Sequence, residues 1–396
     1  MRILILGAGA LGTAGALHLA EAGHDVTVFE ARQVAGGTTG FAAGILSMAL
    51  ADPHDRHLTR QTIAAFDALG VDAPTPLLHR PGSHLLVAPG EEARVVDTIR
   101  HGLDEMGVAN TRLAAAEWGD VMAARGIEAT SGGVDHVLDL PGDAWALSTD
   151  ATTRMATAAK QAGARFRTAT VAGLLGAARA TGVRLADGTH VEADAVVVAL
   201  GAWSRDFLAA AGLRLPARGY RTHAAVLRSP LGARLPIVHD NAGCYYLRPE
   251  SDDHVLVGNG TRTDPVGPDG FSNNAEPYFM EGIAARVPTR FPQLGAAGLQ
   301  NAWRGILTGV PDKRPLVGRH PDRPGLFLLT GGNGFGFMRS HALGACLAAV
   351  VDDARPAGLP LDTLAWMDPA RFWPDPPEAF PVMEGFQLLP PGHADG

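Results

Sequence analysis

The chain has 396 residues, a formal net charge of −8 at pH 7 and a pI near 6.0. With 46% hydrophobic residues it can bury one large or two ordinary cores, which excludes a disordered chain or a collagen-like rod. The negative charge excludes a general nucleic-acid binder, because phosphate backbones are bound by clustered lysine and arginine. Two cysteines, Cys244 and Cys346, cannot build a disulfide scaffold or a cysteine-based metal site, so we expect a reducing compartment and no metal.

The first element is a short apolar run at residues 2–6, RILIL, which predicts a strand buried on both faces of a parallel sheet. Because this run follows Met1 directly, we expect no cleavable signal peptide. Later apolar runs, such as 195–200 and 326–329, are too short to span a bilayer. The sequence therefore predicts a cytoplasmic protein without a transmembrane segment.

The next segment, GAGALG at 7–12, contains a GxGxxG motif. Small and apolar residues at helical spacing follow it and predict a helix that ends at Gly23. Residues 26–29 predict a second strand, which ends at Glu30. Strand, glycine turn, helix, strand and acid in this order are typical of a dinucleotide-binding βαβ unit, and a unit without a ligand is the alternative.

Each position of this unit has a physical role. Gly7 permits the tight turn, Gly9 lets the backbone approach a pyrophosphate, and Gly12 lets the helix and strand pack closely. The N-terminus of the helix supplies N–H groups and partial positive charge. Glu30 would accept hydrogen bonds from ribose hydroxyls and repel a 2′-phosphate, so the unit favours a nucleotide with a free 2′-hydroxyl.

Two further segments favour FAD over NAD. Residues 36–44, GGTTGFAAG, are small residues and hydroxyls that can lie against a cofactor beyond its pyrophosphate. Residues 183–192 predict a hairpin with Asp-Gly at its turn, followed by a strand at 195–199. A small antiparallel hairpin inserted into a nucleotide-binding sheet is the organisation of flavoproteins of the glutathione-reductase type.

A third glycine-rich segment lies near the end of the chain. A strand at 325–330 leads into GGNGFG at 331–336 and then into an apolar helical run at 341–351. The N–H groups of this loop and the start of this helix would face the electron-rich end of a flavin ring.

Taken together, the ordered motifs resemble the FAD-dependent amino-acid oxidoreductase superfamily. This superfamily contains D-amino acid oxidase and dehydrogenase, glycine oxidase, sarcosine oxidase, and the dimethylglycine and L-proline dehydrogenases. The motifs are GAGALG and the acid at 7–30, GGTTGFAAG at 36–44, ADAVVVALGAWS at 193–204, PARG at 216–219, YYLRP at 245–249 with VG at 257–258, WRG at 303–305, PDKRPLVG at 311–318 and GGNGFGFM at 331–338.

The resemblance implies an α/β fold in which a Rossmann-like FAD-binding domain of the glutathione-reductase type is interleaved with an antiparallel-sheet substrate domain. We expect the FAD-binding domain at 1–79, 145–219 and 311–373, the substrate-binding domain at 80–144 and 220–310, and an extended, proline-rich C-terminal tail at 374–396.

The resemblance also implies the cofactor. We expect noncovalent FAD, because no cysteine lies at 303–311, where sarcosine oxidases attach their flavin. The residues expected to bind it are Gly7, Gly9, Ala10, Leu11, Gly12, Glu30, Ala31, Arg32, Gly37, Thr38, Thr39, Ala42, Ala43, Gly44, Val171, Gly201, Trp203, Gly305, Gly332, Asn333, Gly334, Phe335, Gly336, Phe337 and Met338.

The implied reaction moves a hydride from a carbon beside nitrogen to the flavin, so positioning matters more than a general base. A substrate carboxylate is usually clamped by an arginine with a tyrosine beside it, because the guanidinium fork matches a carboxylate. Motif position makes Tyr246, Arg248, Arg304 and Met338 candidates for the catalytic site, with Arg339 a further candidate arginine. Met338 stands where sarcosine-oxidase-like members carry a carboxylate-binding lysine, which favours the proline and dimethylglycine dehydrogenases.

The expected partners are a small amino acid or amine and an electron acceptor, which is oxygen, a quinone or a partner protein. The lysine that helps some oxidases activate oxygen aligns near Leu256, which favours a dehydrogenase, although oxidases without that lysine keep both open. Phe335 takes the position of a histidine in the last glycine motif. Two alternatives remain: an NAD(P)H-dependent flavin monooxygenase, and the FAD-binding subunit of a multicomponent amine oxidase.

Several polar residues receive a structural interpretation. The histidines His223, His239 and His341 lack metal-ligand spacing, so we expect them to be structural or at the surface. The charged segment 52–57 predicts a solvated loop, with an entrance loop to the active site as the alternative.

Overall fold

The structure is a computed structural model that describes residues 1–71, 74–87, 91–259, 267 and 272–377. The expected tail at 374–396 therefore lies outside the described residues from 378 onward. In the described part of the chain, no helix is both long and apolar enough to cross a membrane.

A six-stranded sheet forms the first layer of the fold. All its neighbouring strands are parallel except the β18–β19 pair, which is antiparallel. The strands, in spatial order, are β18 (Leu316–Arg319), β19 (Leu326–Thr330), β12 (Ala195–Val198), β1 (Arg2–Leu6), β2 (Asp25–Glu30) and β8 (Arg165–Thr168).

Helices cover one face of this sheet, and a small sheet covers the other. The helices α1 (Ala10–Glu21), α5 (Ser148–Gln161) and α8 (Gly336–Val351) pack together, and their apolar residues form one core with alternate residues of β1, β2 and β12. The opposite face packs against a three-stranded sheet and against α6 (Ser204–Ala209). The three strands are β9 (Val171–Leu175), β10 (Gly182–Leu185) and β11 (His190–Glu192).

Most predicted elements of this half are confirmed. The strands at 2–6, 26–29 and 195–199 and the hairpin at 183–192 lie where the sequence predicts them, within one or two residues. The helix predicted at 341–351 is longer and begins at Gly336, because the glycine loop runs directly into its first turn.

An eight-stranded sheet forms the second layer. It is antiparallel, as expected, except for the parallel β4–β14 pair. These two strands come from separate chain segments, so a long crossover through the six-stranded sheet joins them and a parallel pair is possible. The spatial order is β17 (Gly298–Gly309), β13 (Arg218–Arg228), β16 (His254–Asn259), β15 (Tyr245–Ser251), β14 (Ile237–Asp240), β4 (Ser83–Val87), β6 (His136–Leu140) and β5 (Thr111–Ala114).

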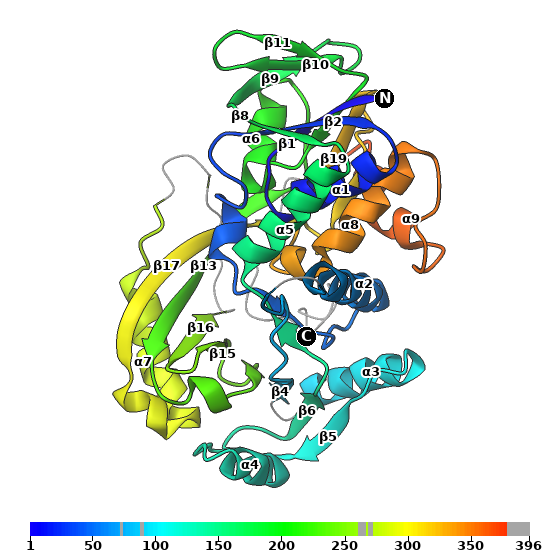
Figure 1. The fold of residues 1–396 in the computed structure, drawn as a ribbon. Helices are drawn as coiled ribbons and strands as arrows, with labels where there is room; N and C mark the ends of the chain where they lie inside the picture. Colours follow the sequence, from blue (N-terminus) through cyan, green and yellow to red (C-terminus); the bar gives the residue numbers. More distant parts are fainter. Residues whose placement is uncertain (72–73, 88–90, 260–266, 268–271, 378–396) are drawn as a thin grey trace.

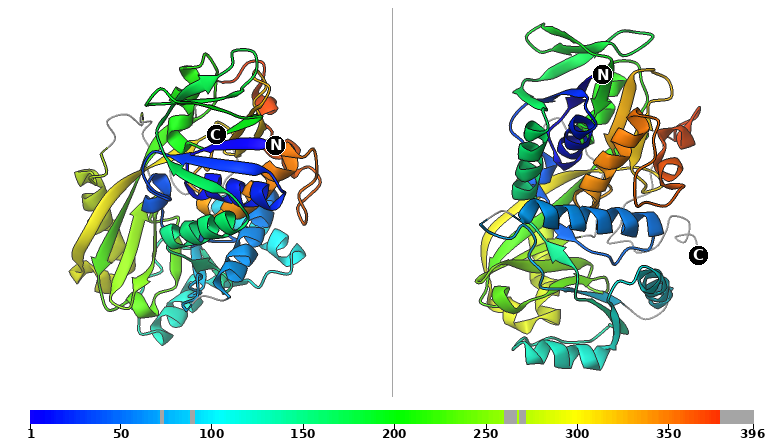
Figure 2. Two further views of the ribbon diagram at one scale, coloured as in Figure 1. Left: turned by 45° about the horizontal axis from the view of Figure 1, so that its top comes forward. Right: turned by 45° about the vertical axis from the view of Figure 1, so that its right-hand side comes forward.

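The outer face of this sheet packs against α4 (Ala115–Ala124) and α7 (Pro277–Arg290), whereas α3 (Glu91–Glu105) packs near β4. The long strands β13 and β17 reach from this sheet toward the six-stranded one (Figure 1). Helix α2 (Pro53–Gly70) packs against α8, as the turned views show (Figure 2). A short ladder of β3 (Ile45–Leu46) and β7 (Ala144–Trp145) and the helix α9 (Thr363–Met367) complete the elements used below.

Candidate functional site

A cavity of about 670 Å³ has walls from both large sheets. It is lined by the residues that follow β1, β2 and β19 and by side chains of β13, β14, β15 and β17. The carboxyl ends of parallel strands meet at one edge of a sheet, which is why turns far apart in the sequence line one cavity. Every residue expected to bind FAD lines this cavity except Gly12.

The turn after β1 is shaped by the absence of side chains. Gly7 has a φ of +100°, and a Cβ there would lie 2.6 Å from the carbonyl oxygen of Ala199. A Cβ on Gly12 would lie 2.0 Å from the carbonyl oxygen of Gly7. Gly12 therefore lies beneath the turn rather than in the cavity, and it has the close-packing role that the motif predicts.

Helix α1 begins at this turn without a cap from its own N-cap residue. Its N-cap is Gly9, which supplies no side-chain hydrogen bond, and its first turn holds no acidic residue. Gly9, Ala10 and Leu11 all line the cavity. The N–H of Ala10 donates to the hydroxyl oxygen of Thr39 at 3.0 Å. This end of the helix carries the partial positive charge and the N–H groups that bind phosphate groups.

The carboxylate of Glu30 is held at the end of β2. It accepts hydrogen bonds from the N–H of Ala8 at 2.9 Å and from the N–H of Arg32 at 3.0 Å. Glu30 also lines the cavity, so the oriented carboxylate can accept hydrogen bonds from the hydroxyls of a ribose.

A second glycine turn, at 331–336, leads from β19 into α8. Asn333 has a φ of +52°; its Oδ1 accepts from the N–H of Val310 at 2.7 Å, and its Nδ2 donates to the carbonyl oxygen of Gly331 at 2.5 Å. Helix α8 begins at Gly336 without a side-chain cap, and its first turn has no acidic residue. Two helix N-termini thus meet the same cavity.

These features fit FAD. The glycines next to α1 leave the backbone open to a pyrophosphate, the carboxylate of Glu30 suits a ribose, and the second helix N-terminus suits the electron-rich edge of a flavin. At Gly37 and Gly336, an added Cβ would meet no heavy atom within 4 Å, so the backbone there lies open. Of the predicted hydroxyls, Thr38 donates to the carbonyl oxygen of Ile306 at 2.7 Å and so ties the segment 36–44 to β17.

Tyr246, the candidate tyrosine for the substrate side, lines the cavity from β15. Its ring lies over Gly258 on the neighbouring strand, where a Cβ would come within 2.1 Å of the ring carbon Cζ. Burial raises the pKa of Tyr246 to about 12, so the hydroxyl stays protonated at neutral pH and can donate a hydrogen bond. Met338 also lines the cavity, from the first turn of α8.

His239, expected to be structural or at the surface, lines the cavity instead. It lies directly opposite Tyr246 in the antiparallel β14–β15 pair, lines the cavity and is 1% exposed. Burial lowers the pKa of His239 to about 4, so its imidazole is neutral at neutral pH. Only the strand register brings it to the cavity, and no motif marks it. The other missed lining side chains include Phe41, Ile45, Thr222, Leu307 and Thr308.

Arg248 does not line the cavity, which corrects its expected role as a substrate clamp. Its Nε donates to the carbonyl oxygen of Ala43 at 2.5 Å, and Nη1 donates to the carbonyl oxygen of Pro249 and pairs with Glu250, both at 2.6 Å. The guanidinium lies 4.1 Å from the ring centre of Trp145. Arg248 therefore supports the segment 36–44 from behind.

Arg304 also does not line the cavity, and this prediction is corrected as well. Gly305 and Leu307 line the cavity, so the alternation of β17 turns Arg304 to the opposite face of the sheet. There its Nη1 pairs with Glu276 at 2.9 Å.

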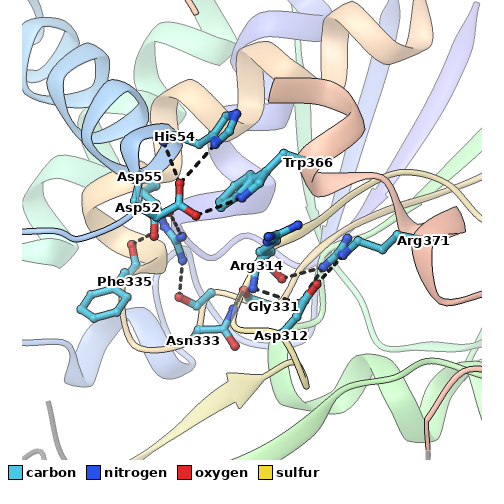
Figure 3. Close-up of polar contacts among 12 residues, drawn as sticks. Asp52, His54, Asp55, Asp312, Arg314, Gly331, Asn333, Phe335, Trp366 and Arg371 are labelled. Atoms are coloured by element: carbon cyan, nitrogen blue, oxygen red, sulfur yellow. Dashed lines mark hydrogen bonds and ion pairs between the residues drawn. The ribbon is translucent and has the colours of Figure 1, made fainter. Parts of the chain in front are cut away.

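The third candidate arginine, Arg339, is fully buried outside the cavity and pairs with Asp55. The segment 52–57, expected as a loop, is the N-cap and first turn of α2. Figure 3 shows this region, with Asp55 near Phe335 and Asn333 of the second glycine turn.

Comparisons with known proteins agree with this geometry. The family model described as FAD dependent oxidoreductase matches residues 2–350. The glycine oxidase of Geobacillus kaustophilus is 28% identical over 366 residues, covering 88% of this chain and 92% of that protein. The D-amino acid dehydrogenase of Cereibacter sphaeroides is 29% identical over 414 residues, covering 90% of this chain and 93% of that protein.

The fold is shared with a solved structure. The crystal structure of L-proline dehydrogenase from P. horikoshii superposes with a TM-score of 0.83 at 22% identity, covering 94% of this chain and 97% of that chain. Since the family model spans most of the sequence, the chain belongs to the FAD dependent oxidoreductase family.

Proposed function

We propose that the chain binds FAD noncovalently and oxidises the carbon–nitrogen bond of a small amino acid or of a secondary or cyclic amine. The observation that carries this proposal is the single cavity that joins the nucleotide features around Glu30 to the side chains of Tyr246 and His239. When bound, FAD accepts a hydride from the carbon beside the substrate nitrogen. The names of the relatives, glycine oxidase and D-amino acid dehydrogenase, support the substrate class.

The side chains at the far end of the cavity suit this reaction. Phe41, Ile45 and Leu307 supply an apolar wall that excludes water from the reacting carbon. Tyr246 offers a hydroxyl that stays protonated, and His239 offers a neutral imidazole, so the subsite carries no net charge from this pair. Neither Cys244 nor Cys346 lines the cavity, which supports noncovalent binding.

We also propose that the chain comprises two discontinuous domains. The six strands of the first sheet fall within 1–79, 145–219 and 311–373, and the second sheet falls within 80–144 and 220–310 except for the first two residues of β13. This distribution supports the division that the resemblance implies.

The test is the visible spectrum of the purified protein, recorded anaerobically before and after addition of D-, L-, N-methyl and cyclic amino acids. We expect a flavin spectrum that one of these classes bleaches, and the speed of recovery in air then separates an oxidase from a dehydrogenase. A chain that neither carries nor takes up FAD contradicts the cofactor assignment. Bound flavin that no amine reduces contradicts the substrate class.

The substrate side is tested by Gly258→Ala. Its methyl group would overlap the ring of Tyr246 and displace the hydroxyl, so we expect flavin reduction by the substrate to slow about tenfold. We expect Tyr246→Phe to slow flavin reduction to the same extent, because both variants remove the hydroxyl from its position in the cavity. Full-rate reduction in both variants would exclude Tyr246 from the substrate site.

A further inference from the structure

An ion pair with a fully buried arginine and a partly buried aspartate lies directly behind the second glycine turn. Arg339 is in the first turn of α8 and has no exposed surface, and it pairs with Asp55 in the first turn of α2. Replacing a buried ion pair by apolar residues of similar size is often neutral or stabilising, so the pair is weak evidence for a role in stability. Its contacts with the turn point to another role.

The guanidinium of Arg339 binds the turn at two places. Nη2 donates to the carbonyl oxygen of Gly332 at 2.7 Å, and Nε donates to the carbonyl oxygen of Phe335 at 3.3 Å. Nη1 donates to the carboxylate of Asp55. A planar fork with donors in fixed directions can hold three acceptors at once, which an ammonium group on a flexible stem does less well.

These bonds, with one from Asn333, direct three carbonyl groups of the turn toward the protein. The carbonyl oxygens of Gly332 and Phe335 face Arg339, and that of Gly331 accepts from the side chain of Asn333. The same turn lines the cavity and ends in the uncapped N-terminus of α8. The turn thus directs the positive end of α8, rather than these three carbonyl groups, at the cavity.

Asp55 is itself held in place from the outside. The N-cap of α2 is Asp52, which accepts from the N–H of His54 at 2.8 Å and from Nε1 of Trp366 at 3.1 Å. The rings of His54 and Trp366 stack with their centres 4.9 Å apart. Figure 3 shows these side chains around the start of α2. Helix α9, which carries Trp366, therefore fixes the helix end from which Asp55 reaches Arg339.

We propose that Arg339 and Asp55 form a positioning pair, which sets the direction of the turn 331–336 and so tunes how strongly bound flavin accepts negative charge. The pair acts through the backbone of the turn, and neither side chain lines the cavity. This inference rests on the FAD site of the proposed function but not on its substrate.

The experiment removes both charges together, in the holoenzyme, with Arg339→Met combined with Asp55→Leu. Sulfite is the probe, because it is an anion that binds to flavins and bleaches their absorbance, and the midpoint potential of the flavin is the second readout. We expect the variant to fold and retain FAD. We expect its sulfite affinity to fall about tenfold and its midpoint potential to decrease, because Arg339 no longer orients the carbonyl groups of the turn. Once a substrate is known, we expect kcat to fall more than KM rises.

Two single variants complete the test. Arg339→Lys keeps the positive charge but loses the planar fork. We expect its sulfite affinity and midpoint potential to decrease as well, but less than in the double variant. If the double variant does not fold, Arg339→Lys alone decides the question. Arg371→Gln is the matched control, since Arg371 pairs with Asp312 at 2.7 Å nearby without contacting the turn.

Wild-type sulfite affinity and midpoint potential in the double variant, or in Arg339→Lys where that variant decides, would overturn the proposal. Both readouts need bound flavin and no substrate. These readouts can therefore contradict the positioning role of Arg339 and Asp55 without contradicting amino-acid oxidation. They can also support the positioning role in a protein whose flavin no amino acid reduces.

Discussion

The two glycine turns of this molecule bring helix N-termini to one cavity by different physical means. The turn after β1 is limited mainly by backbone contacts, since Gly7 and Gly12 approach other backbone atoms so closely that no Cβ fits. Glu30 and Thr39 add hydrogen bonds to its N–H groups. The turn after β19 also contains glycines, but its direction depends on the side chains of Asn333 and Arg339.

The difference separates local from long-range determinants. The steric requirements of the first turn involve residues close in the sequence, apart from Ala199, and they leave a recognisable motif. The second turn relies on Asp55, which is 284 residues from its partner Arg339. A turn built from backbone tolerates no added atom, whereas a turn held by side chains is sensitive to the loss of one donor or acceptor.

Gly12→Ala is expected to have the largest effect. The added Cβ would lie 2.0 Å from the carbonyl oxygen of Gly7, so α1 must move away from β1. We expect the free energy of unfolding to fall by about 3 kcal/mol or more and bound FAD to be lost. Urea unfolding and the flavin content of the purified protein measure the two effects.

The control for this change is Gly119→Ala in α4, another helical glycine, at which an added Cβ meets nothing within 4 Å. We expect this control to retain FAD and to gain up to about 1 kcal/mol, because alanine has the higher helix propensity. Normal FAD content in Gly12→Ala would show that the first turn is not limited by backbone contact.

The same contrast recurs where β3 meets β7. Gly44 has a φ of +72° and would place a Cβ 1.9 Å from a backbone oxygen, whereas nearby Asp143 acts through its side chain. Its carboxylate is buried and accepts from the N–H of Met48 at 3.0 Å and from the hydroxyl of Ser83 at 2.6 Å. Burial raises the pKa of Asp143 from 3.8 to about 6 despite these hydrogen bonds.

A raised pKa in the folded state fixes the sign of the pH dependence. The folded chain holds a proton on Asp143 at pH values where the unfolded chain has lost it, so this contribution to stability is complete below about pH 4 and is lost as the pH rises through about 6. Asp143→Asn stays neutral at every pH. We expect its free energy of unfolding to rise relative to wild type across this interval, by about 3 kcal/mol at most.

Urea unfolding at several pH values between 4 and 7 measures this difference. Asp187→Asn is a control for which the pH dependence of stability has the opposite sign. Hydrogen bonds from Thr189 lower the pKa of Asp187 in the exposed hairpin turn, so wild type should gain stability relative to this variant as the pH rises. If the difference in the free energy of unfolding between Asp143→Asn and wild type stays constant with pH, burial does not raise the pKa of Asp143.

Prediction from sequence follows the same division between local and long-range determinants. The βαβ unit and the hairpin were predictable, and the residues expected to bind FAD line the cavity except for Gly12, because glycine spacing and apolar runs act over short distances. The arginine candidates were not, since strand alternation turns Arg304 away and Arg248 binds carbonyl groups behind the cavity. His239 reaches the cavity only through its register with Tyr246, which no local pattern encodes.

Asn333→Gly tests the contrast between the turns most directly, although its effect is the smallest. Glycine adopts the φ of +52° without strain, so a turn shaped by backbone alone would gain about 1 kcal/mol. A turn held by side chains instead loses the bonds to Val310 and Gly331 and leaves a buried N–H without its acceptor. We expect the loss of these hydrogen bonds to outweigh the relief of backbone strain, so that urea unfolding shows a net destabilisation of about 1 kcal/mol.

The matched variant Asn333→Asp keeps an acceptor for the N–H of Val310 but cannot donate to the carbonyl oxygen of Gly331. We expect weaker sulfite binding in both variants, because each releases that carbonyl group to turn toward the flavin. If Asn333→Gly is more stable than wild type and binds sulfite equally well, the second turn is shaped by its backbone like the first. The side-chain contribution to the second turn would then come from Arg339.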